Sequence, residues 1–458
     1  STNFSTALSH TRGEAVQLSE TAAIANIADI RQLNKILAEA EGAVTMAITD
    51  TGGSNLLLDT AGAGLALTGA ASGDAVTIDL GTVAATTELL TEIDNLGAQA
   101  GITTITANVT GITDALIADL DSLTNIDNSS KFDITYTTTG ATNFADATTL
   151  AGKTGKTGGA AIGFVGGVTA TAAQMIDGSS ASAGLTAITG KDSDVALTIS
   201  GFSTPATSTQ ITALNLTATN TTGNTVATFT TTKSVAAGLS SSAFSSGTDD
   251  LTITISDALS VSEFEYLDAR TDQSLVLSVG ITDDLSNLIT VADASSGLKA
   301  AVADDSDITI TISDSSITSD DFTKVNTLAN TATYAGGFTG GIVATISGTA
   351  ATLSGDNLNQ LAAATDNISF TVSDDPSLAE LKTISDRTSN ANITVTGSIT
   401  DDLYNFIKSG DNTSNEDDFA TALAHTVNEP IVVNAYTVST NNHITAINAL
   451  LAAAEAGV

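Results

Sequence analysis

Pairs of adjacent aspartates are the residues of this sequence whose type and spacing could do chemistry. They recur between segments with strand-like and helix-like patterns. A carboxylate at the start of a helix accepts hydrogen bonds from orphan backbone N–H groups and complements the helix dipole. Grouped carboxylates can instead bind calcium, which takes about six to eight oxygen ligands. Both interpretations apply to the seven pairs, Asp249-Asp250, Asp283-Asp284, Asp304-Asp305, Asp320-Asp321, Asp374-Asp375, Asp401-Asp402 and Asp417-Asp418.

Two acidic clusters are the candidate calcium sites. Neither has the spacing of an EF-hand loop, and the Gly-Gly-x-Gly-x-Asp nonapeptide of secreted calcium-binding repeats is absent. Helix capping therefore explains most of the pairs, and calcium is the functional alternative. The ligands that we predict are Asp304, Asp305 and Asp307 in one cluster and Glu416, Asp417 and Asp418 in the other.

Other reactive groups are scarce. The chain has no Cys, which excludes disulfides, thiolate metal sites and Cys nucleophiles, and its three His lack metal-ligand spacing. No Gly-x-Ser-x-Gly is present. The run Lys153-Thr-Gly-Lys-Thr-Gly-Gly159 resembles a phosphate loop, but Leu150 stands where the first glycine is required. We therefore predict that the protein is not an enzyme.

The net negative charge of the chain argues against nucleic acids and anionic membranes as partners. Among 458 residues, 51 Asp and Glu stand against 14 Lys and Arg, which gives a net charge of -37. Nucleic-acid binding needs clustered cations, and an anionic membrane surface would repel this chain. The apolar fraction of 42% and the mean hydropathy of +0.21 still provide for sizeable cores. The uncharged stretch 158–176 consists mainly of Gly, Ala and Thr, so we predict strands and turns there and no membrane insertion.

Three similar segments indicate an internal repeat. Asp250–Asp257, Asp307–Asp314 and Asn367–Asp374 alternate apolar and mostly hydroxyl-bearing residues, as a strand with one buried face does, and they recur at a nearly constant spacing. A helix-like spacing of apolar residues follows each of them. A second strand and a short helix complete each unit, so the predicted repeat is strand–helix–strand–helix and about 60 residues long.

The remaining chain varies this pattern. Strand and helix patterns alternate between about residues 76 and 136, whereas 138–248 is rich in Gly, Ser, Thr and Ala, with alternating runs such as Ile211–Leu216. We interpret 138–248 as a mostly β middle domain. The predicted fold class is α+β and β-rich. The predicted divisions are an arm at 1–14, a strand–helix domain at 15–137, the middle domain at 138–248, three repeats at 249–430 and an incomplete repeat at 431–458.

The two ends of the chain resemble each other. Residues 30–44 align without gaps to 444–458, with seven of fifteen positions identical. The first copy continues into the strand pattern Val44–Ile48, and the second stops where that strand would begin. Two hypotheses stay open: the half unit caps itself or belongs to a longer array, or a neighbouring subunit completes it. For the second, the predicted contact residues are Ser1, Phe4 and Leu8 in the arm, and Ile444, Ile447, Leu451 and Val458.

The region from about 249 to 458 resembles the strand–helix repeats of S-layer-like proteins and giant secreted adhesins of bacteria, of a cyanobacterial or marine type. The matching segments are Ile253–Asp257, Ile310–Asp314 and Phe370–Asp374, each with the helix that follows it. This resemblance implies an exported coat, filament or adhesin that often binds calcium.

We therefore expect a secreted, self-assembling structural protein at the cell surface, which forms an extracellular filament, tube or S-layer-like lattice. Its partner would be itself, with other cell-surface components as further partners. Unlike ends give the heterologous contact that an open polymer needs. The alternative is a stalk or binding segment of a large calcium-dependent adhesin.

Overall fold

The structure is a computed structural model in which the chain forms two compact units. The first unit contains Ser1–Phe229, Gly238–Leu251 and Arg270–Asp272, and the second contains the rest. The described residues are 14–18, 20–25, 27–50, 67–156, 161–244, 248–271, 273–290, 293–334, 337–389, 393–406, 430–434, Ile444, Ile447, Asn448 and Leu451.

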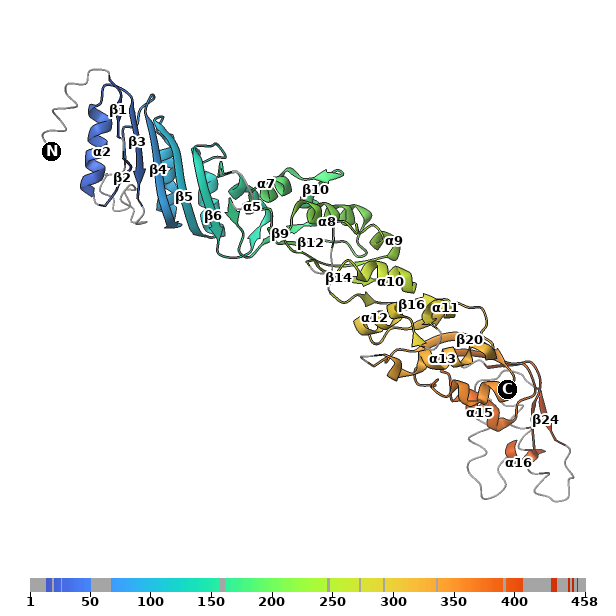
Figure 1. Cartoon of the computed structure of the whole chain (residues 1–458). Helices are drawn as coiled ribbons and strands as arrows, with labels where there is room; N and C mark the ends of the chain where they lie inside the picture. The colour runs from blue at the N-terminus through green and yellow to red at the C-terminus, as the bar shows by residue number, and fades with distance from the viewer. Residues whose placement is uncertain are drawn as a thin grey trace. The chain divides into compact units, whose positions relative to one another are not determined.

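The first unit begins with a seven-stranded parallel sheet (Figure 1). Its order is β1, β3, β4, β5, β6, β8, and β2 also pairs with β3. Strand order thus follows chain order, and a helix separates most neighbouring strands. The strands are β1 (Val16–Gln17), β2 (Ala22–Ala23), β3 (Val44–Thr49), β4 (Ala75–Ala84), β5 (Ile102–Ile112), β6 (Phe132–Thr138) and β8 (Ile162–Gly163).

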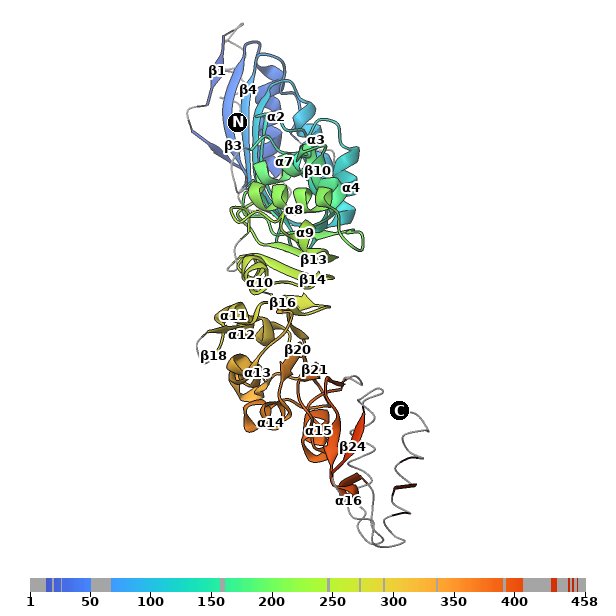
Figure 2. The same cartoon turned by 90° about the vertical axis from the view of Figure 1, so that its right-hand side faces the viewer.

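The connecting helices form a row beside this sheet. They are α2 (Ile27–Glu39), α3 (Thr87–Ala98), α4 (Asp114–Ser122) and α5 (Phe144–Ala151). Contacts join α3 to α4 and α4 to α5, and the row lies along one side of the strands (Figure 2). Right-handed crossovers between sequential parallel strands place every helix on the same face. In β6, Phe132, Ile134 and Tyr136 are buried, and the residues between them are partly exposed.

A second parallel sheet of the first unit follows the same plan. β7 (Thr142–Asn143), β9 (Val168–Thr171), β12 (Leu197–Ser200) and β13 (Thr225–Thr231) are neighbours in that order. The pair β10 (Ile176–Asp177) and β11 (Ser180–Ala181) is antiparallel. The helices are α6 (Ala172–Met175), α7 (Ala183–Lys191) and α8 (Ser208–Asn220).

The second unit repeats the alternation of strand and helix. Its parallel pairings are β14 with β15, the five-strand order β16, β19, β20, β21, β22, and β23 with β24. Its strands are β14 (Asp250–Ile255), β15 (Val276–Leu277), β16 (Ile281–Asp283), β17 (Ile289–Thr290), β18 (Asp293–Ala294), β19 (Ile310–Ile312), β20 (Ile342–Gly348), β21 (Asn367–Val372), β22 (Ile393–Val395), β23 (Ile399–Asp401) and β24 (Ile431–Val433).

The helices of the second unit are short. The α-helices are α9 (Lys233–Ala236), α10 (Val261–Asp268), α11 (Leu285–Leu288), α12 (Ser296–Asp304), α13 (Phe322–Ala329), α14 (Ala350–Ser354), α15 (Leu378–Ser385) and α16 (Leu403–Phe406). In the described part of this unit they are accompanied by the 3₁₀ turns η1 (Ser319–Asp321), η2 (Thr331–Thr333) and η3 (Asp356–Leu358).

These sheets correct the predicted fold class. The protein is α/β with parallel sheets, built from β–α–β units of the kind found in Rossmann-like folds, and not a β-rich α+β protein. Among the described strands, only β10–β11 and β17–β18 pair in antiparallel fashion. The prediction was wrong because alternating strand patterns do not reveal strand direction, whereas a helix between paired strands makes them parallel.

The expected β-rich character of 138–248 was also wrong, because α5, α7 and α8 lie there. Ile211–Leu216, which alternates as a strand would, belongs to α8. Threonine disfavours helices, but its hydroxyl can bond the carbonyl four residues earlier. In α8, Thr212, Thr217 and Thr219 make this bond at 2.8–3.0 Å. The hydroxyls are thus satisfied within the helix.

Each of the predicted repeats contains two smaller structural units. We call one strand together with the helix that follows it a coil. Successive coils begin with β20 at Ile342, β21 at Asn367 and β22 at Ile393. The expected strand–helix–strand–helix unit therefore corresponds to two coils. The predicted positions of the three similar segments are confirmed, since β14, β19 and β21 lie within them and α10, α13 and α15 follow.

Close packing between coils generates the first prediction. A Cβ atom added to Gly155 would lie 1.7 Å from the Ser129 carbonyl oxygen of the preceding coil, whereas one added to Gly140 would meet nothing within 4 Å. We expect Gly155→Ala to lower the free energy of unfolding by about 1–3 kcal/mol through overpacking. Gly140→Ala is the matched control and should change little. Chemical denaturation measures both, and equal midpoints would contradict the close approach.

Candidate functional site

Aspartates at the ends of strands bind the start of the helix in the preceding coil. In each case a carboxylate oxygen accepts the N–H of the first residue of that helix, at 2.6–3.1 Å. This N–H has no partner within its own helix, and a negative charge there complements the helix dipole. The five bonds are Asp257 to Lys233, Asp283 to Val261, Asp314 to Leu285, Asp374 to Ala350 and Asp401 to Leu378.

The helix α10 shows how complete this capping is. Its own N-cap residue, Ser260, accepts the N–H of Glu263 at 3.2 Å, and the Glu263 carboxylate accepts the N–H of Ser260 at 2.8 Å. Asp283 of the next coil then accepts the N–H of Val261 at 3.0 Å. Of the predicted pairs, Asp283-Asp284, Asp374-Asp375 and Asp401-Asp402 thus supply a helix cap through their first member, but the capped helix belongs to the preceding coil and not, as expected, to the segment that follows the pair.

A second row of aspartates lies near the starts of the strands. These carboxylates accept N–H groups from the strand region of the preceding coil: Asp74 from Val44 at 2.7 Å, Asp192 from Phe164 at 3.2 Å, Asp249 from Thr225 at 3.1 Å and Asp366 from Ile342 at 2.8 Å. Asp94 lies in the helix α3 and makes a bond in the opposite direction, because it accepts the N–H groups of Asn125 and Ile126 in the following coil.

The predicted calcium ligands near residue 304 belong to this second row. Asp304 accepts the N–H of Leu275 at 2.9 Å, and Asp305 accepts the N–H of Leu277 at 3.0 Å. Burial raises the pKa of both carboxyls, and a hydrogen bond with Asp307 adds to the rise at Asp305. Within the described ranges no group of three or more His, Asp or Glu could hold a metal ion. Glu416, Asp417 and Asp418 lie outside those ranges, so calcium binding stays a prediction.

Basic side chains bind the opposite ends of the helices. A helix leaves carbonyl groups without partners at its C-terminus, and cations are favourable there. Lys131 Nζ donates to Gly97 O and Gln99 O at the end of α3, and Lys153 Nζ donates to Leu123 O at the end of α4. The buried Arg387 donates to Leu353 O and Ser354 O at the end of α14. These cations therefore bind backbone of the preceding coil.

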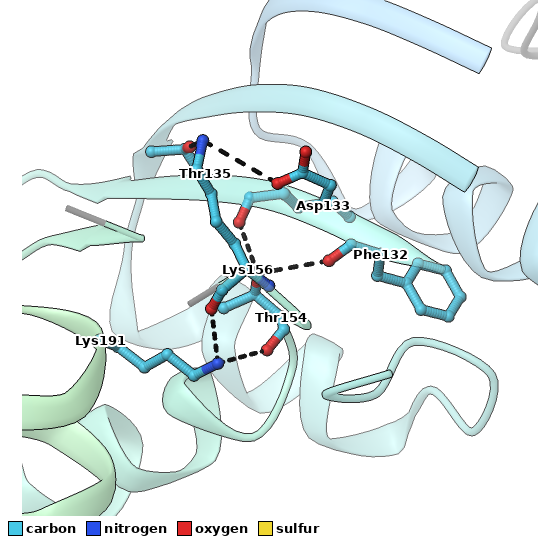
Figure 3. A network of polar contacts seen from close by, with 7 residues as sticks. Phe132, Asp133, Thr135, Thr154, Lys156 and Lys191 are labelled. Carbon is cyan, nitrogen blue, oxygen red and sulfur yellow. Dashed lines mark hydrogen bonds and ion pairs between the residues drawn. The ribbon is translucent and has the colours of Figure 1, made fainter. Parts of the chain in front are cut away.

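Figure 3 shows such a connection across three successive segments of the first unit. Lys191 Nζ donates to the carbonyls of Thr154 at 2.9 Å and Lys156 at 2.7 Å. Thr154 in turn donates its hydroxyl to the Ile134 carbonyl at 2.6 Å. Lys156 Nζ donates to the Thr135 hydroxyl at 2.8 Å and lies 4.0 Å from the Asp133 carboxylate. The lysines of the run that resembles a phosphate loop therefore hold protein groups.

Sequence reasoning missed these basic residues, although one signal was present. The dipeptide Arg270-Thr271 recurs as Arg387-Thr388, at a spacing that matches two of the expected repeats. The Thr271 hydroxyl donates to Leu251 O and accepts the Leu251 N–H, and Thr388 does the same with Ile368. Arg270 Nε donates to Leu239 O. The recurring dipeptide thus marks a repeated set of backbone bonds.

The predicted interface residues are only partly described. Ser1, Phe4, Leu8 and Val458 lie outside the described residues. Ile444, Ile447 and Leu451 are helical, with Ile444 50% and Leu451 56% exposed. Their counterparts in the similar segment, Ile30 and Leu37 of α2, are 0% and 7% exposed.

No protein-family model matches the chain, and no curated protein matches it either. None of the described helices is long and apolar enough to cross a membrane. The function must therefore be argued from the residues themselves.

The strand-end caps generate a second prediction. Asp314→Ala removes the acceptor of the Leu285 N–H, which is 2.7 Å away, and should lower the free energy of unfolding by about 0.5–2 kcal/mol. Asp320→Ala removes the same charge from an exposed position six residues away and serves as the control. Thermal denaturation of both variants measures the difference. Equal stability of the two variants would contradict the role of Asp314 as a cap.

A third prediction concerns pH. Burial, together with the neighbouring Asp194 carboxyl, raises the pKa of Asp192 to about 6, against about 3.9 for an unfolded Asp. Between these values the folded state holds more protons, so the contribution of Asp192 to stability is full below about pH 4 and is lost as the pH rises through 6. Asp192→Asn keeps an acceptor for the Phe164 N–H and should flatten the decline of melting temperature between pH 4 and 7.

The exposed Asp177 provides the control for this measurement. Asp177→Asn should leave the pH dependence of the melting temperature as it is in the parent chain. An Asp192→Asn variant with the same pH dependence as the parent chain would show that Asp192 does not titrate in this range.

Proposed function

We propose that this protein is an extracellular structural protein that assembles with copies of itself into a filament, tube or S-layer-like lattice at the cell surface. The observation that carries the proposal is the contrast between two similar helical segments. Ile30 and Leu37 are buried in the first, whereas Ile444 and Leu451 are half exposed in the second. These residues are seven positions apart, so they share one helix face. Two exposed apolar side chains on one face favour a protein partner.

A second copy of the chain fits this face best. In α2 the same residue pattern is buried where the helix connects β2 and β3 of a parallel sheet. Among the described strands, the short strands β1 and β2 form one edge of the seven-stranded sheet, and a further coil added at this edge would continue the pattern. Such a contact joins two different surfaces, and repeated heterologous contacts produce open polymers.

The capped strand ends favour a structural role over a catalytic one. Open α/β sheets bind ligands beyond the carboxyl ends of their strands, often with phosphate at a helix N-terminus. In this chain, Asp257, Asp283, Asp314, Asp374 and Asp401 occupy five helix N-termini at that edge. The polar groups are therefore engaged in joining coils.

The fourth prediction tests assembly. The purified chain should form regular polymers that electron microscopy and sedimentation detect, and Ile444→Asp combined with Leu451→Asp should leave monomers with an unchanged melting temperature. Val165→Asp places the same charge at a residue that is 70% exposed in the first unit, and it should polymerise normally.

Each outcome separates the hypotheses. A parent chain that remains monomeric would overturn the proposed assembly, and a monomer that binds cells would favour the adhesin stalk. Normal polymers from the double variant would show that another surface carries the contact. Repeating the parent measurement with a calcium chelator tests calcium, since unchanged assembly and melting temperature would count against a bound ion.

A further inference from the structure

A groove between α9 and α10 in the second unit is a surface feature that the proposed assembly does not use. The helix α9 has four residues and α10 has eight, so α9 leaves part of its neighbour uncovered. The resulting groove has a volume of about 410 Å³. Its lining residues, here called the α9–α10 groove, are Lys233, Ala237, Leu259, Ser262, Glu263, Tyr266 and Leu267.

The Tyr266 ring and the buried side chains of Leu259 and Leu267 form the apolar part of the groove. The Tyr266 side chain is 41% exposed, and its hydroxyl donates to the Ala237 carbonyl at 3.3 Å, which links α10 to the residue that follows α9. Leu259 and Leu267 are 0% and 2% exposed and close the groove beneath. A tethered ring of this kind offers a preformed surface for the apolar C–H face of a ligand.

An ion pair forms the polar part. Lys233 Nζ lies 3.4 Å from Glu263 Oε2, and the two side chains remain 43% and 44% exposed. The Ser260 N–H donates to Glu263 and is the largest cause of the lowered pKa of that carboxyl, which is therefore ionised at neutral pH. Lysine supplies donors and glutamate supplies acceptors next to each other. This arrangement suits neighbouring hydroxyl groups, each of which both donates and accepts.

We propose that the α9–α10 groove binds an uncharged saccharide, with its C–H face against Tyr266 and its hydroxyls on Lys233 and Glu263. The net charge of -37 disfavours anionic polymers, and a cationic ligand would bind acidic surface throughout the chain. The groove itself combines one positive and one negative side chain, so it favours a neutral, polyhydroxylated ligand. The proposal goes beyond self-assembly, since it assigns the protein a carbohydrate ligand.

The fifth prediction uses the full chain and four neutral probes, cellotetraose, maltotetraose, chitotetraose and mannotetraose. Saturation-transfer NMR should detect at least one of them, with transfer strongest at the C–H protons on one face of a sugar ring. Tyr266→Ala should weaken that binding by about tenfold, which corresponds to about 1.4 kcal/mol. Tyr266→Phe keeps the ring and should retain most of the affinity.

Control variants keep the test decisive. Val279 is 49% exposed and lies outside the groove lining, so Val279→Ala should bind like the parent chain. A melting temperature for each variant verifies folding. No binding of any probe, equal binding by Tyr266→Ala, or stronger binding of an anionic tetragalacturonate would each overturn the proposal. None of these outcomes depends on whether the chain polymerises.

Discussion

A helix leaves about four N–H groups at its start and four carbonyls at its end without partners in its own backbone. In this protein many of those groups bind side chains of the adjacent coil, with aspartates at helix starts and lysines or arginines at helix ends. Asp283 on α10 and Lys131 after α3 illustrate the two kinds. The short helices, of which α11 has four residues, gain partners that isolated helices of this length would lack. The bonds that join stacked coils therefore also stabilise the short helices.

This constraint also shapes what the surface can do. Carboxylates that hold backbone N–H groups are less available to a metal or a phosphate, which is why an acidic chain can carry many aspartates without an evident metal cluster among its described residues. Asp304 and Asp305 show this, since each accepts an N–H of the preceding coil. The proposed saccharide site beside the short helix α9 uses side chains that are not among these coil-to-coil aspartates.

The sequence predicted the positions of strands and helices better than it predicted how they pair and which side chains bind them. Alternation in Asp250–Asp257 and helical spacing after it located β14 and α10, because burial of one face is a local pattern. Strand direction depends on pairing between distant segments, which periodicity does not encode. The strand-end role of Asp283 was hidden for the same reason, because its partner, Val261, lies 22 residues earlier. Thr-rich α8 was missed because its hydroxyls bond the helix itself.

The direction of the capping bonds has a consequence for how the chain is produced. Where an aspartate at the end of a strand binds the start of a helix, the aspartate belongs to the later coil and the helix to the earlier one, as with Asp401 and Leu378. A chain synthesised from its N-terminus therefore presents these five helices before the aspartates that complete their capping. The newest coil stays unfinished until the next one emerges, and completed coils accumulate behind it. The coil at the growing end therefore lacks the bonds that the following coil supplies.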